Sequence, residues 1–270
     1  MLSSRSIVGL LAILTMLIAT HHASALSYQD TVLADNPLAY YRFSEVAGVS
    51  ATDQTGNGNT GTYIGGADLT APGSPLSGFG TPNSATGFNG SNAAVNTNVS
   101  LSGLGAFTLE LWVNPAAAQT NRTGLVGQND AIEFGFINAN TIQLWTPSNG
   151  ALNVAYSSGG NAGEWIHVVG VGTGTQKLVY INGVLAGTQN HGATANYGTS
   201  GFFTNIGGDG VYDGGGNWFN GTLDEVAIYG EALGADQIQA HFNSRVPEPA
   251  TAALGVIGIG LLGMRRRRNG

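Results

Sequence analysis

The acidic residues of this sequence are spaced in a way that argues against polysaccharide cleavage. Enzymes that cut glycosidic bonds on a sheet use two carboxyl groups roughly 5–10 Å apart, and residues two positions apart share one face of a strand. Glu110 and Glu133 have no acidic residue at that spacing. Asp224 and Glu225 are adjacent, so on a strand they would point to opposite faces.

Other catalytic groups are missing or lack a recognisable context. The chain has no cysteine, and no motif surrounds His167, His191 or His241. The glycine-rich residues 207–210 lack the lysine and the following helix of a phosphate-binding loop. We therefore expect a protein that is not an enzyme. A hydrolase whose carboxylates come from separate loops is the alternative that one sequence leaves open.

Residues 53–61 form a segment rich in oxygen donors, with an aspartate, a glutamine, two asparagines, two threonines and three glycines. Calcium is held by six to eight oxygens from carboxylates, amides and backbone carbonyls, so calcium is a candidate cofactor. The alternative is that Asp53 and Asn57 form turns in which each side chain bonds the backbone two residues on.

Residues 209–218 form the most distinctive loop, a glycine run flanked by two aspartates and two aromatic residues. Binding pockets combine aromatic side chains with a few placed polar groups. Tyr212, Asp213 and Trp218 are therefore candidate ligand-binding residues at a glycan rim. The sequence favours the simpler alternative, a surface turn whose aromatic rings pack back onto the core.

The chain between its two ends reads as short strands separated by Gly, Asn, Asp and Pro. In residues 106–113, apolar side chains alternate along one face, and Asn182-Gly183 predicts a tight hairpin. Strands are predicted at 38–43, 106–113, 131–137, 141–145, 165–169, 177–181, 202–206 and 222–229, and one helix at 234–242. This pattern predicts an all-β fold, a two-sheet antiparallel sandwich.

Composition and charge narrow the possible partners. Glycine accounts for 43 of 270 residues and charged residues for only 9%, which suits many tight turns. Residues 26–245 contain four basic and fifteen acidic residues, a formal charge of −11. Nucleic acid is bound through Lys and Arg, so we expect no nucleic-acid partner. Neutral polymers and divalent cations are compatible with this charge.

The first 25 residues have the composition of a secretory signal peptide. Arg5 precedes a nearly continuous apolar run, and Ala23, Ser24 and Ala25 supply the small residues of a cleavage site. We expect cleavage after Ala25 and an exported domain at 26–245. The alternative is an uncleaved anchor.

The last 25 residues, 246–270, place Val246-Pro247-Glu248-Pro249 before fifteen apolar residues (250–264) and four arginines (265–268). The apolar run is short for a membrane span, which needs about 20 residues, and the arginines would stay on the cytoplasmic side. This order resembles the PEP-CTERM sorting signal. The resemblance implies that an exosortase in the membrane processes the tail, with Pro247, Glu248 and Pro249 as recognition residues. A plain tail anchor is the alternative.

The body resembles laminin-G-like, concanavalin-A-like jelly-roll domains. Six segments carry the resemblance in order, at 36–43, 53–61, 107–113, 163–168, 179–184 and 219–229. The resemblance implies a jelly-roll sandwich and, in many members, a calcium ion at its rim between loop 53–61 and the Asp-Glu-Val strand. Carried over to this chain, the implied metal ligands are Asp53, Asn57 and Asp224.

Together these features predict a non-catalytic, lectin-like binding module that is exported and sorted to the cell surface or the extracellular matrix. Its predicted partners are an exosortase-type enzyme, the membrane through the unprocessed tail, and an extracellular polysaccharide or another matrix or biofilm component. A structural matrix protein without a specific ligand is the main alternative.

Overall fold

The computed structural model describes residues 26–119, 122–156 and 164–246, which build two antiparallel β-sheets and two α-helices. Sheet A contains β1 (Ala39–Tyr41), β4 (Asp68–Pro72), β5 (Ser84–Asn89), β7 (Phe107–Pro115), β12 (Ile166–Gly172), β13 (Gln176–Ile181), β14 (Val184–Asn190) and β16 (Asn220–Tyr229). Sheet B contains β2 (Ser50–Ala51), β3 (Gly61–Ile64), β6 (Ala94–Asn96), β8 (Thr123–Gln128), β9 (Ile132–Asn138), β10 (Thr141–Thr146), β11 (Gly150–Ala155) and β15 (Asn205–Ile206). The helices are α1 (Tyr28–Ala34), α2 (Ala235–Ser244) and the short 3-10 helix η1 (Ser77–Phe79).

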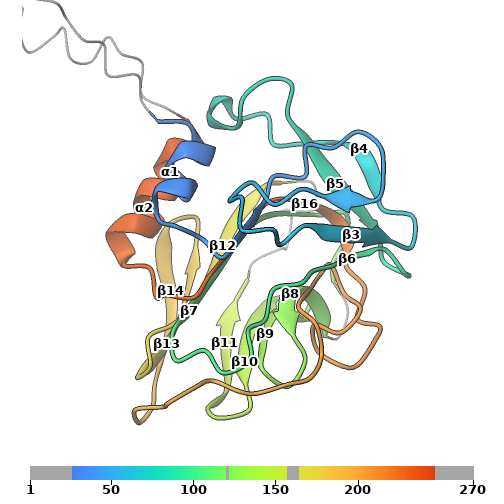
Figure 1. Ribbon diagram of the computed structural model, residues 1–270. Helices are drawn as coiled ribbons and strands as arrows, with labels where there is room; N and C mark the ends of the chain where they lie inside the picture. The colour runs from blue at the N-terminus through green and yellow to red at the C-terminus, as the bar shows by residue number, and fades with distance from the viewer. Residues whose placement is uncertain (1–25, 120–121, 157–163, 247–270) are drawn as a thin grey trace, which may run out of the picture. The chain divides into compact units, whose positions relative to one another are not determined.

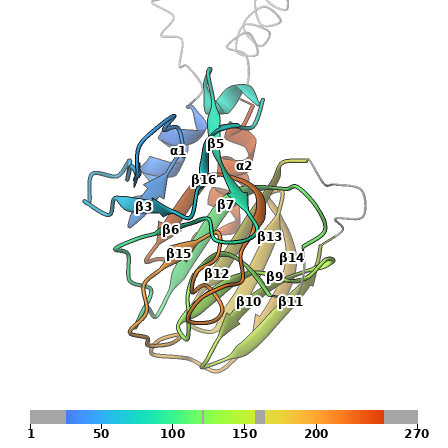
Figure 2. The same cartoon turned by 90° about the vertical axis from the view of Figure 1, so that its right-hand side faces the viewer.

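The order of strands is β14-β13-β12-β7-β16-β5-β4 in sheet A, with β1 paired to β16, and β11-β10-β9-β8-β15-β6-β3-β2 in sheet B. Every described strand pair is antiparallel. The predicted all-β, two-sheet sandwich is therefore confirmed. Figure 2 shows β11 and β14, which are edge strands of different sheets, next to each other at one side of the sandwich.

The main core fills the space between the two sheets. On β7, the predicted alternation places Phe107, Leu109, Leu111 and Val113 in this core, each completely buried. Because successive side chains of a strand point to opposite faces, the residues between them face the other side of sheet A. There Trp112 joins a second apolar cluster under the helices.

Several elements differ from the sequence-based expectation. Helix α1 was not predicted, although Ser27 caps it by accepting a hydrogen bond from the Asp30 backbone N–H. The segment predicted as a strand at 202–206 is a strand only at β15, and both Phe202 and Phe203 are exposed. Strands β3, β4, β5, β6, β8 and β11 lie in segments rich in Gly, Asn and Pro, where no strand was predicted.

Helices α1 and α2 pack against each other on the outer face of sheet A (Figure 1). Tyr28 and Val32 of α1 and Ile238 of α2 are completely buried in the cluster around Trp112. Phe242 of α2 stacks on the Trp112 ring with the centroids 5.9 Å apart. The first and last described helices are thus held on the same strands.

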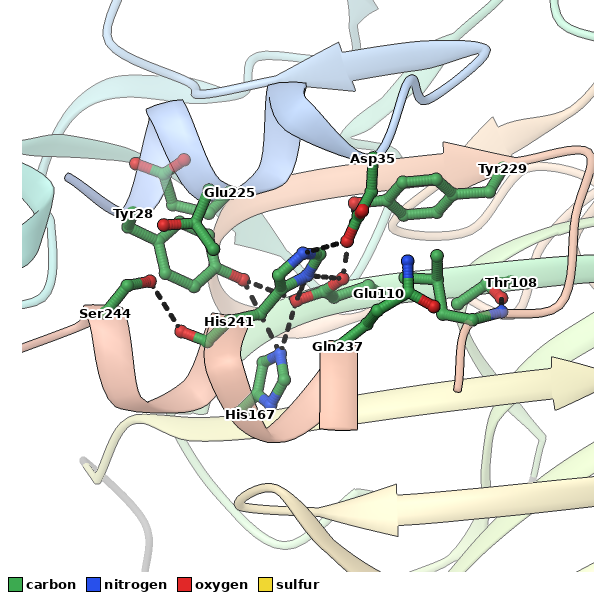
Figure 3. Close-up of polar contacts among 12 residues, drawn as sticks. Tyr28, Asp35, Thr108, Glu110, His167, Glu225, Tyr229, Gln237, His241 and Ser244 are labelled. Atoms are coloured by element: carbon green, nitrogen blue, oxygen red, sulfur yellow. Dashed lines mark hydrogen bonds and ion pairs between the residues drawn. The ribbon is translucent and has the colours of Figure 1, made fainter. Parts of the chain in front are cut away.

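A cluster of largely buried polar side chains fixes the two α-helices to sheet A (Figure 3). We call it the Glu110 cluster, and its members are Tyr28, Asp35, Glu110, His167 and His241. The Glu110 carboxylate on β7 lies 2.7 Å from His167 Nε2 on β12 and 2.8 Å from His241 Nδ1 on α2. Tyr28 Oη of α1 donates a hydrogen bond to Glu110 Oε1 at 2.8 Å. The other ring nitrogen of His241 lies 2.9 Å from Asp35 Oδ2, just after α1.

Opposite charges face each other in the Glu110 cluster, because His241 lies between the carboxyl groups of Glu110 and Asp35. Glu110 and His241 are both completely buried. Burial alone would lower the pKa of His241, but attraction to Glu110 and Asp35 outweighs burial and raises it to about 9. Burial alone would raise the pKa of Glu110, but His241 and His167 hold it well below its usual range. At neutral pH, an imidazolium therefore faces a carboxylate, and breaking such a buried pair by removing one partner costs about 3–5 kcal/mol.

Replacing His241 should destabilise the domain and change how its stability depends on pH. We expect His241→Gln to lower the free energy of unfolding by about 3–5 kcal/mol, because Glu110 keeps a buried charge without its partner. A histidine whose folded pKa is raised stabilises fully below its unfolded value of about 6.5, and loses this effect as the pH rises through about 9. Urea unfolding should show a decline in the native chain from pH 6 to 9.5. Because the raised pKa values of Glu133 (about 8) and Asp224 (about 7) make stability fall in both chains below pH 8, the decline from pH 8 to 9.5 is the part that His241→Gln should largely lack.

The matched control is His191→Gln, which removes a histidine outside the Glu110 cluster that contacts Tyr197 instead. It should leave the decline between pH 6.5 and 9 in place. Equal stability of the native chain and His241→Gln at pH 6 would show that the buried pair does not hold α2.

Candidate functional site

An open cleft of about 410 Å³ lies on the outer face of sheet B, the side of the sandwich away from the helices. We call it the sheet B cleft. Its lining residues come from β9, β10, β11 and the segment before β8, namely Arg122, Glu133, Ile137, Gln143, Trp145 and Ala151. They face outward because their neighbours Phe134, Phe136, Ile142 and Leu144 point into the main core.

The strand register places an aromatic ring beside a carboxyl group in this cleft. Trp145 on β10 is directly opposite Glu133 on β9, and opposite Ala151 on β11. Directly opposed residues of antiparallel strands have Cβ atoms about 4.5–5.5 Å apart. Trp145 is half-buried, so part of its ring is accessible, and Glu133 lies at the floor with 3% exposure.

Arg122 links the floor of the cleft to the loop between β15 and β16, residues 207–219. Its guanidinium donates a hydrogen bond to the Tyr212 carbonyl at 3.2 Å and lies 3.4 Å from the Asp213 carboxylate. The same guanidinium sits 5.3 Å from the centre of the Tyr212 ring, a cation–π distance. Glu133 Oε2 is farther away, at 3.9 Å.

Two glycines of β8 let this loop lie against sheet B as a wall beside the cleft, whose lining includes none of the loop residues. A Cβ atom at Gly124 would stand 2.5 Å from Val211 Cβ, and one at Gly127 would stand 2.6 Å from the Ile132 carbonyl oxygen. Neither position has room for a side chain. Since Gly127 is opposite Glu133, the loop reaches the edge of the floor carboxyl.

The floor of the cleft combines several kinds of hydrogen-bonding group. Gln143 Nε2 donates to Asn153 Oδ1 at 2.8 Å, which leaves its amide oxygen as an acceptor. Burial raises the pKa of Glu133 to about 8, so this group carries a proton at neutral pH. An aromatic platform next to such groups can bind a ligand with both an apolar face and hydroxyl groups.

The predicted ligand-binding residues lie in and next to this wall. Tyr212 is buried, and its hydroxyl lies 3.5 Å from the Gln143 carbonyl oxygen. Asp213 is exposed and is joined to the cleft through Arg122. Trp218 is half-buried over Gly208, at the far end of the loop, and does not line the cleft. The structure thus brings Tyr212 and Asp213 together with Arg122, and places Trp218 elsewhere.

Asp53 and Asn57 share loop 53–61, which folds around the Asp53 carboxylate. Both carboxylate oxygens of Asp53 accept hydrogen bonds, from the backbone of Tyr40, Thr55 and Asn59 and from the Thr55 hydroxyl. Asn57 Nδ2 donates to the carbonyls of Pro37 and Leu38, each at 3.2 Å. These hydrogen bonds are those of a turn held together by its own side chains, and they leave the Asp53 oxygens less available to a metal ion.

Asp224 lies in a different set of contacts. It is completely buried, its Oδ2 accepts a hydrogen bond from Asn83 Nδ2 at 2.9 Å, and burial raises its pKa to about 7. Asp224 Oδ1, Asn83 Oδ1 and Ser74 Oγ are buried oxygens without a hydrogen-bond partner among the described residues. In the described ranges, no group of three or more His, Asp or Glu side chains is arranged to hold a metal ion.

The Glu110 cluster has the chemistry of an active site but no access. Glu110, His167 and His241 are all completely buried, so a substrate cannot reach them without displacing α2. Sequence reasoning missed this cluster because its members are far apart in the chain. The sequence did contain one signal of the cluster: the acidic residue Glu110 lies between the core residues Leu109 and Leu111, on a strand that is buried on both faces.

The predicted processing residues Ala25, Pro247, Glu248 and Pro249 lie outside the described residues, as do the predicted span 250–264 and the arginines 265–268. Among the residues described, no helix is long and apolar enough to cross a membrane.

Comparison with known structures supports the fold. Domain 4 of AbnA, a GH43 extracellular arabinanase from Geobacillus stearothermophilus, in complex with arabinotriose, aligns with a TM-score of 0.54 and 21% identity, over 76% of this chain and 97% of that one. A structure of botulinum neurotoxin type C, whose cell entry depends on interaction with two ganglioside molecules, aligns with a TM-score of 0.53 and 16% identity, over 80% of this chain.

The binding domain of Paraclostridial Mosquitocidal Protein 1 aligns with a TM-score of 0.55 and 16% identity, over 78% of this chain. The aligned part spans 53% of each of the two toxin chains. A search of curated proteins found no match.

Two protein families match the sequence itself. The PEP-CTERM protein-sorting motif matches residues 245–268, which confirms the predicted resemblance of the tail and implies export and sorting. The concanavalin A-like lectin/glucanases superfamily matches residues 88–239, a segment that includes every residue lining the sheet B cleft. The chain therefore belongs to the concanavalin A-like lectin/glucanases superfamily.

Proposed function

We propose that this protein is an exported carbohydrate-binding module that holds a neutral polysaccharide in the sheet B cleft. The observation that carries the proposal is the pairing of a half-buried Trp145 with Glu133 directly opposite, in an open cleft of about 410 Å³. A sugar ring has an apolar face for the indole and hydroxyl groups for the carboxyl and amide beside it.

Charge favours a neutral ligand over an acidic one. Arg122 is the one cation among the cleft-lining residues, and Asp213 already lies within 3.4 Å of it. The domain around the cleft has a formal charge of −11. An anionic polysaccharide would be repelled by this field and would have to displace Asp213, whereas a neutral one meets neither cost.

The ligands of two similar structures add support. One structure is a complex with arabinotriose, and the other protein interacts with ganglioside molecules. Both are carbohydrate or carbohydrate-bearing ligands bound by proteins that share this fold. These structures have 21% and 16% sequence identity to this chain, and they support carbohydrate as the class of ligand.

Trp145→Ala should weaken polysaccharide binding at least tenfold without unfolding the domain. The exported chain should give signals above background on an array of neutral polysaccharides, including arabinan, xylan and β-glucan, and weaker signals on polyuronates. Removing the indole removes the stacking surface, and we expect affinity for the best array ligand to fall by tenfold or more. Isothermal titration calorimetry measures that affinity.

The matched control is Trp218→Ala, which removes a half-buried tryptophan outside the cleft and should leave affinity unchanged. Binding that depends on Trp218 and not on Trp145 would move the site to the far end of the loop. A chain that binds nothing above background would point to the matrix protein without a ligand. Release of reducing sugars from the array polysaccharides would show hydrolysis instead.

We further propose that an exosortase-type enzyme processes the tail after the domain has crossed the membrane, and that the tail tethers the domain until then. The sorting motif at 245–268 supports this step. Mass spectrometry of the protein isolated from its native cells should find a C-terminus upstream of Arg265. An intact arginine block on most molecules would show that the tail is a plain anchor.

Calcium remains a proposed cofactor, with Asp53, Asn57 and Asp224 as its candidate ligands. The three residues differ in how well their surroundings suit a calcium ion. The oxygens of Asp53 are occupied by backbone and hydroxyl donors, whereas Asp224, Asn83 and Ser74 each have a buried oxygen that lacks a partner. Such oxygens suit a hard cation, so Asp224 is the more favourable position.

Calcium should raise the melting temperature of the exported domain, and a chelator should lower it. A ligand that binds only the folded state stabilises by about 2.7 kcal/mol at a hundredfold excess over Kd. The response should disappear in Asp224→Asn and persist in Asp213→Ala, and Asp53→Ala reports whether loop 53–61 takes part. Identical melting curves in calcium and chelator would leave both places as ordinary hydrogen-bonded structure.

A further inference from the structure

Glu133 has fewer hydrogen bonds than a buried carboxylate needs. Its Oε1 accepts one bond, from the Asp130 backbone N–H at 3.1 Å. Its Oε2 lies 3.9 Å from Arg122 Nη2, which is beyond hydrogen-bond distance. Only 3% of Glu133 is exposed, and that exposure faces the open sheet B cleft. A buried carboxylate in this position is costly unless it gains a proton or a ligand.

The charges facing Glu133 do not favour its ionised form. Asp130, at the turn before β9, and Asp213, in the loop beside the cleft, both add negative charge, and Arg122 is the only cation facing Glu133 among the described residues. Arg122 is already engaged by Asp213 and by the Tyr212 carbonyl. From β10, the directly opposed residue is Trp145, which does not titrate. Burial, the largest effect, raises the pKa of Glu133 to about 8.

We propose that Glu133 is the specificity-determining hydrogen-bond donor of the sheet B cleft, a protonated carboxyl that donates to an oxygen of a neutral sugar stacked on Trp145. This inference rests on the proposed function. A protonated carboxyl group has one O–H donor as well as an acceptor, whereas a carboxylate only accepts. The free oxygen, Oε2, is the atom that would carry this proton, because Oε1 already accepts from Asp130.

The register explains how a sugar on Trp145 would reach this donor. Trp145 and Glu133 are directly opposed across β9 and β10, so their Cβ atoms are separated by about 5 Å. A sugar ring centred on the indole therefore places its ring substituents over the carboxyl. The Gln143 amide oxygen, on the same face of β10, offers an acceptor for a neighbouring hydroxyl.

Such a donor makes binding depend on pH in a definite direction. Below about pH 8, Glu133 keeps its proton and can donate. As the pH rises through that value, the donor is lost and a negative charge appears beneath the sugar, so affinity should fall. A carboxylate that acts as an acceptor would give the opposite trend, with affinity rising as the pH increases from 4 to 6.

The test uses the purified full chain with arabinotriose and cellotriose as neutral probes, titrated calorimetrically from pH 5.5 to 9. We expect affinity to be constant up to about pH 7.5 and to fall roughly tenfold by pH 9. Glu133→Gln keeps a donor that never ionises, so its affinity should stay within about threefold of native at pH 6 and remain flat to pH 9. Glu133→Ala should bind weakly at every pH.

Two further measurements separate the outcomes. The side-chain carboxyl of Glu133, followed by carbon-13 NMR without ligand, should titrate near pH 8, and a midpoint near 4.5 would overturn the inference. Glu225→Gln removes another completely buried carboxyl whose pKa is raised by burial, and should keep the native fall in affinity.

Native affinity that stays flat to pH 9, or Glu133→Gln binding as weakly as Glu133→Ala, would also overturn the donor role while leaving carbohydrate binding intact. If neither probe binds at pH 6 and the neutral polysaccharide array is blank as well, the proposed function itself is wrong, and the donor role fails with it.

Discussion

The Glu110 carboxylate is the constraint on which the arrangement of the domain depends. It stands on the central strand β7, on the face opposite the main core, with no exposure to water. A charge in that position is tolerated only when it is paired and hydrogen-bonded. Its partners come from α1, β12 and α2, and the contact between Asp35 and His241 joins residues 206 apart in the chain. One side chain thus holds both ends of the domain on a single sheet.

On the opposite face of the sandwich, the structure depends on the close approach of a loop to sheet B. The loop between β15 and β16 can approach sheet B only because positions 124 and 127 have no side chain. Once there, it supplies Asp213 and the Tyr212 carbonyl to Arg122, and so draws the guanidinium away from Glu133. The raised pKa of Glu133 is therefore a consequence of how the loop packs, as well as of burial.

The sequence predicted the features whose signals are local. Alternation in β7, the Asn182-Gly183 hairpin and the helix near Ile238 all follow from neighbouring residues. Helix α1 was missed because seven residues beside a signal peptide show no extended apolar period, although Ser27 and Asp30 form a capping pair. Of the ligand-binding candidates, Tyr212 and Asp213 contact Arg122 beside the cleft, and their role in binding stays a prediction. Trp145 and Glu133 meet through strand register, which the spacing within a single sequence does not reveal.

The two α-helices and the sheet B cleft therefore lie on opposite faces of the sandwich. Both α-helices cover the outer face of sheet A (Figure 1), whereas the cleft opens on the outer face of sheet B. Helix α2, the last described element before the sorting motif, is thus separated from the cleft by both sheets. A polysaccharide chain lying over Trp145 would not contact α2. The loop that shapes the cleft can vary in sequence without disturbing Glu110 and its partners, because the two sets of residues share no contact among those described.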